Sequence, residues 1–262
     1  MITVLTPTFN RAHTLERLFN SLAVQTGAGF EWLVVDDGST DDTQAVLERL
    51  GPQAGFDMRV IRQNNGGKHV AVNTGCAAAR GEWVFIVDSD DMLTPDAIEA
   101  VHAQIRANTE PDVVGLCFRK AHETGELIGQ VTAYEAPVYL HPTEAGKIFK
   151  GDLAYIFLRS SLLAHPFPVI PDEKFVPELY IWNKIGDEGK ILFVQDKVIY
   201  LCEYLPDGYT ANFSGYLKRN PRGFLLFYWS QALRERTMFY KTKYMIRTVQ
   251  CLLYACLKRA RS

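Results

Sequence analysis

The sequence lacks several features that would each define a class of protein. Its five cysteines form no CxxC pair and no Cys/His set with metal-ligand spacing, which indicates reduced thiols. No apolar run reaches 18 residues, so we expect no transmembrane helix, and Met1 leads directly into a predicted strand without a signal peptide. A GxGxxG segment, the signature of dinucleotide-dependent dehydrogenases, is also absent. These absences favour a reduced, cytoplasmic globular protein.

Charge is distributed unevenly along the chain. Residues 216–262 contain eleven Lys or Arg against one acidic residue, so this tail carries about +10 and the remainder about −12. From Lys241 to Arg261, basic residues alternate with apolar ones, a pattern typical of a helix lying on anionic lipid at a membrane surface. The same apolar stripe would equally suit packing on the body of the protein or on a second copy in a homo-oligomer. Both alternatives remain open from the sequence.

Strand and helix patterns alternate through the first 118 residues. Short apolar runs at residues 2–5, 32–35, 58–61, 83–87 and 113–118 are typical of buried strands. Helical periodicity separates most of them, which predicts a doubly wound, mainly parallel α/β sheet with helices on both faces. Residues 119–200 are less regular, with strands predicted at 191–194 and 198–201, and the chain from residue 220 onward is predicted to be helical.

Three carboxylates follow the strand at residues 83–87 within four positions. Alternation places Asp88 and Asp90 on one side, where both could reach a divalent cation held by oxygen ligands. Right-handed crossovers bring the loops at 6–11, 36–42 and 88–91 to one edge of the sheet, where open α/β sheets bind ligands. A solvated acidic turn before the next helix is the alternative interpretation.

Three further segments have both a functional and a structural interpretation. Asp36 and Asp37 end a strand and could accept hydrogen bonds from a base or ribose, or could simply form a turn. Residues 65–68, Asn-Gly-Gly-Lys, could bind a phosphate through backbone amides and Lys68, or could form a flexible loop. Glu178 starts a short predicted helix and could be a general base if it faces the cleft, or it could be an ordinary helix-start residue.

Taken together, these segments resemble the inverting family 2 glycosyltransferases of the GT-A fold, which build bacterial surface polysaccharides. The matching segments occur in the family's order at residues 6–11, 34–41, 65–68, 73–75 and 85–91. Weaker matches follow at 175–182 and 206–210. The Gln-x-x-Arg-Trp motif of processive relatives is absent, which favours transfer of a single sugar.

The resemblance implies roles for individual residues. Asp90 would ligate Mn²⁺ or Mg²⁺, with Asp88 near the metal and the ribose, and Lys68 would approach the base or diphosphate. The family usually carries a Glu-Asp pair for the acceptor, with Asp as the base; here the pair is Glu178-Leu179, so the base is assigned to Glu178. The residues expected around uridine are Pro7, Thr8, Phe9, Arg11 and Asp36.

The implied function is metal-dependent transfer, with inversion, of one hexose or N-acetylhexosamine from a UDP-sugar to a hydroxyl of a glycan or lipid-linked acceptor. Residues 1–118 would form the nucleotide-sugar-binding half, 119–215 the acceptor-binding half, and 216–262 a basic helical extension, with no nucleic-acid partner. The setting would be bacterial polysaccharide or glycolipid synthesis at the inner face of the cytoplasmic membrane. Two alternatives remain: a degenerate binding module, because of Leu179, and a nucleotidyltransferase, which would normally carry a Gly-rich first loop with Lys or Arg.

Overall fold

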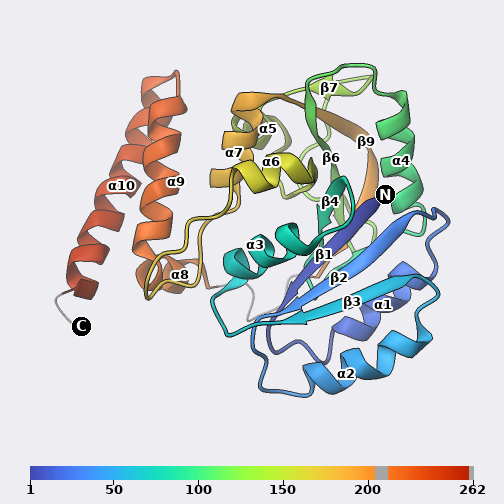
Figure 1. Ribbon diagram of the computed structural model, residues 1–262. Helices are drawn as coiled ribbons and strands as arrows, with labels where there is room; N and C mark the ends of the chain where they lie inside the picture. Colours follow the sequence, from blue (N-terminus) through green and yellow to red (C-terminus); the bar gives the residue numbers. More distant parts are fainter. Residues whose placement is uncertain (204–211, 260–262) are drawn as a thin grey trace.

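The computed structural model describes residues 1–203 and 212–259, so the weak sequence match at 206–210 lies outside the described residues. Its centre is a nine-stranded sheet in the order β3-β2-β1-β4-β8-β6-β9-β5, with β7 paired to β9. Helices cover both faces of the sheet, as predicted (Figure 1). The parallel strands all point the same way, so the loops that follow their carboxyl ends lie on one side of the sheet. The polar loops at 6–11, 36–42 and 88–91 are all on that side.

The first half of the sheet is entirely parallel. Four strands lie side by side: β3 (Asp57–Arg62), β2 (Phe30–Asp36), β1 (Ile2–Thr8) and β4 (Trp83–Ile86). Helices α1 (Leu15–Ala23) and α2 (Thr43–Leu50), the latter followed by a short 3₁₀ turn (Gly51–Gln53), pack on one face, and α3 (Lys68–Ala78) packs on the other (Figure 1). Strands β1, β2 and β4 are buried on both faces, which explains their continuous apolar runs, whereas the outer strand β3 is partly exposed.

The second half of the sheet departs from a simple parallel order. Strand β8 (Leu153–Leu158), which the sequence pattern does not predict, inserts antiparallel between β4 and β6 (Val113–His122). The two predicted strands at 191–194 and 198–201 are wrong as separate elements, since β9 (Lys190–Cys202) is one continuous strand parallel to β6. Its register shifts between Val194 and Val198, which absorbs the polar residues that suggested a break.

Two short antiparallel strands and four helices complete this half. Strands β5 (Met92–Leu93) and β7 (Val138–Tyr139) pair with β9. The helices are α4 (Ala97–Ala107), α5 (Pro142–Phe149), α6 (Arg159–Ala164) and α7 (Leu179–Glu188). Among the strands described, only β5, β7 and β8 oppose the common direction, so the expectation of a mainly parallel sheet is confirmed.

The C-terminal helices lie outside the sheet, and the described chain from residue 220 onward is helical as predicted. They are α8 (Phe213–Arg219), α9 (Pro221–Arg234) and α10 (Met238–Arg259), and α9 lies between α10 and the body (Figure 1). Two buried carboxylates connect α9 to the body: Glu173 accepts hydrogen bonds from the backbone amides of Arg222 and Gly223, and Glu235 lies 2.5 Å from Lys147 Nζ. No helix in residues 1–203 and 212–259 combines the length and apolar character needed to cross a bilayer.

Candidate functional site

The polar loops after β1, β2 and β4 meet at the carboxyl edge of the parallel strands. The Asp37 amide donates to the Thr8 carbonyl at 2.8 Å, and the Val87 amide donates to the Leu5 carbonyl at 2.9 Å. The first two loops are also linked through Asn10, whose side-chain oxygen accepts from the Thr40 amide at 2.8 Å. The edge predicted for ligand binding therefore exists as a set of interlocked loops.

Three carboxylates gather where β4 ends. One oxygen from each of Asp88, Asp90 and Asp91 lies within 4.8 Å of the others. The Asp88 amide donates to the Tyr200 hydroxyl of β9 at 2.9 Å, and the buried Asp91 accepts from the Glu203 amide at 3.2 Å. The loop is therefore held by β9 and the residue that follows it, and its carboxylates converge on a small volume.

The electrostatics of this cluster favour a bound cation. Burial raises the pKa of Asp90, and the Asp88 carboxylate raises it further. Burial and Asp88 likewise raise the pKa of Asp91 to about 7. Burial would also raise the pKa of Asp88, but the Lys68 and Lys120 ammonium groups outweigh it and lower that pKa. A hard divalent cation would relieve the remaining repulsion, and carboxylate oxygens are the ligands that Mn²⁺ and Mg²⁺ accept.

Lys68 connects this cluster to Glu178. Lys68 is the first residue of α3, and its Nζ lies 2.5 Å from Asp88 Oδ1 and 2.8 Å from Glu178 Oε1. Burial would lower the pKa of Lys68, but the two carboxylates outweigh it and raise that pKa. Glu178 precedes α7 directly, with Leu179 as the first helical residue. The condition that Glu178 faces the cleft is therefore met, although 90 residues separate it from Asp88.

A hollow of about 30 Å³, roughly the volume of one water molecule, lies between these side chains. Besides Lys68, Asp88 and Glu178, its lining includes Ile86 and Trp182, which lie within the matched segments. The remaining lining residues are ones that the sequence motifs did not single out: Lys120, Leu153, Ala154, Tyr155 and Tyr200. Lys120 lies near the end of β6, with Nζ 3.7 Å from the Tyr200 ring centroid. The rule that strand ends carry function could have indicated Lys120, whereas Tyr155 and Tyr200 come from strands placed by non-local pairing.

The residues expected around uridine lie at the end of β1. Pro7 and Thr8 are buried, and Thr8 Oγ1 has no hydrogen-bond partner among the described residues. The Phe9 ring is 44% exposed at the edge. Arg11 approaches the carboxylate cluster, with Nε 3.9 Å from Asp90 Oδ2. A buried unpaired hydroxyl beside an exposed aromatic ring is a surface that a planar polar base would complete.

Asp36 and Asp37 shape the loops. Asp36 Oδ1 accepts from the Ser39 amide at 2.9 Å and Oδ2 lies 3.5 Å from Arg62 Nε, so both oxygens of this buried carboxylate contact protein groups. Asp37 accepts from the amides of Gly66 at 2.9 Å and Gly67 at 2.7 Å. The geometry of Asp36 is that of a turn residue, and its contact with the nucleotide stays a prediction. Asp37 holds the loop that positions Lys68.

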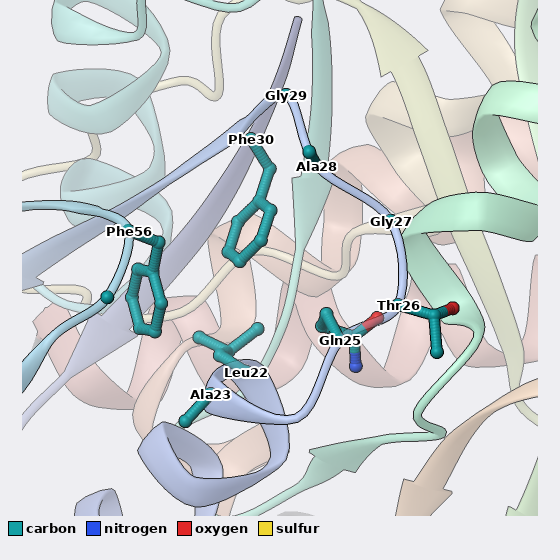
Figure 2. A pocket seen from close by; sticks show the side chains of 10 residues that line it. Leu22, Ala23, Gln25, Thr26, Gly27, Ala28, Gly29, Phe30 and Phe56 are labelled. Atoms are coloured by element: carbon teal, nitrogen blue, oxygen red, sulfur yellow. The ribbon is translucent and has the colours of Figure 1, made fainter.

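A larger hollow of about 300 Å³ lies at the opposite edge of the sheet, lined by residues 22–23, 25–30 and 55–56. Figure 2 shows Leu22, Phe30 and Phe56 directed toward one another there. The Ile2 amide donates to the Gly29 carbonyl beside it, which places it at the start of β1 and β2. It has no titratable side chain in its lining, so the small polar hollow at the carboxyl edge is the candidate active site.

Comparison with known proteins identifies the family. Residues 3–157 match the sequence model of "Glycosyl transferase family 2". The glycosyltransferase GlyG of Streptococcus pneumoniae serotype 4 is 31% identical over 211 residues, which cover 76% of this chain and 69% of GlyG. An uncharacterized glycosyltransferase of Nostoc sp. is 37% identical over 115 residues, covering 44% of this chain and 35% of that protein's own length.

The fold has solved counterparts. TarS 1–349 of S. aureus, in complex with UDP-GlcNAc, superposes with a TM-score of 0.72 at 20% identity, covering 97% of this chain and 72% of that chain. This likeness confirms the expected GT-A fold. Since the family model covers more than half of the sequence, the chain belongs to glycosyltransferase family 2.

Proposed function

We propose that the chain is a metal-dependent inverting glycosyltransferase that moves one sugar from a UDP-sugar to a hydroxyl of a glycan or lipid-linked acceptor. The observation that carries this proposal is the Lys68 ammonium group, which contacts both Asp88 and Glu178 beside the carboxylate cluster. This contact supports a base at Glu178 next to a diphosphate and metal site at Asp88 and Asp90. The UDP-GlcNAc in the TarS structure supports a UDP-linked hexose or N-acetylhexosamine as the donor.

The donor end of the site would be formed by the first loop. The unpaired Thr8 hydroxyl and the exposed Phe9 ring support a uracil contact there, with Pro7 and Asp36 as the rigid frame. Arg11 reaches from this loop toward Asp90 and would contact the diphosphate. The side chains that we propose to bind the nucleotide sugar are Pro7, Thr8, Phe9, Arg11, Asp36, Lys68 and Asp88.

The metal would be held by Asp90 and Asp88. Their oxygens converge with that of Asp91, and the raised pKa of Asp90 reflects its burial and the charge of Asp88, so the donor set fits Mn²⁺ or Mg²⁺. When bound, such an ion supplies charge neutralisation for the departing diphosphate. Lys68, already within 2.5 Å of Asp88, adds a positive charge on the same side.

Glu178 would act on the acceptor. The acceptor oxygen attacks the anomeric carbon opposite the diphosphate, so the new C–O bond forms as the bond to the diphosphate breaks, and the configuration inverts. The hydroxyl proton passes to the Glu178 carboxylate, and UDP leaves. Leu179, where the family usually has a second carboxylate, starts α7 and leaves Glu178 as the acid nearest the cleft in this segment.

A screen for UDP release tests the function. We expect slow UDP release with Mn²⁺ from one of UDP-glucose, UDP-galactose, UDP-GlcNAc and UDP-GalNAc. EDTA should abolish that release. GDP-mannose tests whether the site is selective for the uracil base. Binding of UDP without release from any donor would instead support the degenerate binding module.

The metal assignment has its own test. Asp90→Ala should abolish the Mn²⁺-dependent part of UDP binding measured by calorimetry, because it removes the proposed ligand. Asp57→Ala, which removes an exposed carboxylate at the start of β3, is the matched control and should bind as the unaltered chain does. Equal UDP affinity with and without Mn²⁺ in all three proteins would refute the assignment.

A further inference from the structure

One face of α10 is apolar and exposed. Phe239 is 75% exposed, Ile246 65% and Leu253 61%, values far above those of core residues. Spacings of three, four and seven residues keep the exposed apolar side chains within one arc of the helix. We call this surface the α10 stripe; it comprises Met238, Phe239, Met245, Ile246, Val249, Leu252, Leu253 and Leu257.

The stripe faces away from the body of the protein. The opposite face of α10 packs on α9, with Thr248 and Cys251 buried and the Tyr244 ring stacked 6.2 Å from that of Tyr228. Figure 1 shows α10 as the outermost element, with α9 between it and the sheet. One side of the helix is therefore buried by folding, and the other side remains exposed. The exposed apolar side chains form a continuous patch, unlike the isolated apolar residues that are common on protein surfaces.

The charge of this helix is of one sign. Between residues 236 and 259 there are six basic residues and no acidic one. At roughly 100° per residue, Lys241 and Lys243 fall on opposite borders of the stripe. Lys258 donates to the backbone carbonyls of Asp172 and Arg219. The region thus combines an apolar stripe with basic borders.

We propose that the α10 stripe docks on an anionic lipid surface, with the helix lying in the plane of the interface. The apolar side chains would enter the acyl boundary and the basic borders would contact lipid phosphates. A second copy of the chain is disfavoured as the occupant, because pairing two stripes would bring basic borders together with no acidic residue on either helix. This surface is separate from the Lys68 site, so the inference does not depend on the chemistry proposed there.

Vesicle flotation of the full chain tests the proposal. We expect vesicles of phosphatidylcholine with about one third phosphatidylglycerol to bind at least about tenfold more protein than phosphatidylcholine alone, and added salt to weaken this binding. Ile246→Asp/Leu253→Asp should lower binding to the anionic vesicles at least about tenfold, because it places charge in the apolar stripe. Val24→Asp/Val131→Asp, which makes the same charge change at two exposed aliphatic residues of the body, should bind as the unaltered chain does.

A second variant guards against misfolding of the first. Lys241→Gln/Lys243→Gln leaves the stripe intact and should reduce the preference for anionic over neutral vesicles. Equal binding of the stripe variant and the body variant would overturn the proposal, as would equal binding to neutral and anionic vesicles. Sedimentation that shows a dimer dissociated by the stripe variant, without vesicle binding, would assign the stripe to a second copy and also overturn it.

Discussion

At the scale of the residue, one ammonium group organises the cleft. Lys68 contacts Asp88 and Glu178, two carboxylates from different loops that would otherwise repel each other. On an exposed surface such ion pairs contribute little to stability. In a half-buried cleft the effective dielectric constant is lower, so the same charges attract more strongly and hold one another in position. The consequence is that the candidate base and the candidate metal site keep a defined separation.

The first prediction concerns Glu178. Glu178→Gln should leave Mn²⁺-dependent UDP binding nearly unchanged and lower sugar transfer by about 10²- to 10⁴-fold, the usual contribution of a general base. Steady-state rates and calorimetry with UDP measure the two quantities. Glu188→Gln, at the far end of the same helix, is the control. Full transfer activity in Glu178→Gln would assign the base to another residue.

The second prediction concerns Glu31, a fully buried acid outside the cleft. Its carboxylate accepts from Thr3 Oγ1 and the Arg80 amide, both at 2.7 Å, and pairs with Arg59 Nη1 at 2.9 Å. Burial would raise the pKa of Glu31, but these partners outweigh it, and the pKa falls below its ordinary value of 4.5. Glu31→Gln should therefore lower the free energy of unfolding at pH 7 by about 2 kcal/mol.

The pH dependence of that loss checks its cause. Because the folded-state pKa of Glu31 is depressed, its ionised form stabilises the protein above pH 4.5, and this stabilisation is lost as the pH falls through the folded-state value. The gap in unfolding free energy between the unaltered chain and Glu31→Gln should thus shrink below about pH 4.5. A gap that persists unchanged, or one shared by the exposed control Glu82→Gln, would contradict this account.

At the scale of the element, α3 determines where Lys68 lies. The helix begins after Gly67, whose φ of +97° and whose closeness to the Lys174 carbonyl both require glycine: an added Cβ would lie 2.2 Å from that oxygen. Further along, Gly75 lets the helix approach β1 closely. Two glycines therefore determine the axial position and the depth of the helix that carries Lys68.

The third prediction compares two glycines in helix interiors. In Gly75→Ala the new methyl would lie 2.1 Å from Leu5 Cδ1, so the core must shift, and the free energy of unfolding should fall by about 1–3 kcal/mol. Gly146→Ala in α5 meets no atom within 4 Å and should raise it by up to about 1 kcal/mol through helix propensity. Chemical denaturation measures both values; destabilisation of equal size in the two variants would refute the packing argument.

At the scale of the whole molecule, the helical extension is held to the body at both ends of α9. Glu173 accepts from the first free amides of the helix, where a negative charge also suits the helix dipole, and Glu235 follows its last residue. Glu173 pairs with Arg222, and Glu235 pairs with Lys147. The two buried acids therefore contribute to the attachment of α9, on which α10 packs.

The fourth prediction tests this attachment by hydrogen exchange. Glu173→Gln should speed amide exchange in α9 and α10 by about 5- to 30-fold, corresponding to 1–2 kcal/mol of lost local stability. Exchange in β1 and β2 should stay unchanged, because these strands belong to a separate part of the core. Faster exchange throughout the sheet, or an equal effect from the exposed control Glu126→Gln, would be the contrary result.

The parts of this fold that could be predicted are those determined by local sequence patterns. The strands β1 to β4 and the carboxyl edge with Asp88 and Asp90 follow from apolar runs, turn residues and right-handed crossovers, all of which act over short stretches of chain. The same rules missed β8, because its place between β4 and β6 depends on pairing with strands distant in sequence. They also split β9, because a bulge permits polar residues inside a continuous strand.

The sequence by itself determined the family, the parallel half of the sheet and the grouping of acidic side chains at one edge, since these are written in contiguous motifs. Only the tertiary structure decided that Glu178 meets Lys68, that Lys120 and Tyr200 line the same hollow, and that the α10 stripe faces outward. The physical reason is that helical periodicity defines faces but not their partners. Which face is covered depends on packing between segments far apart in the chain.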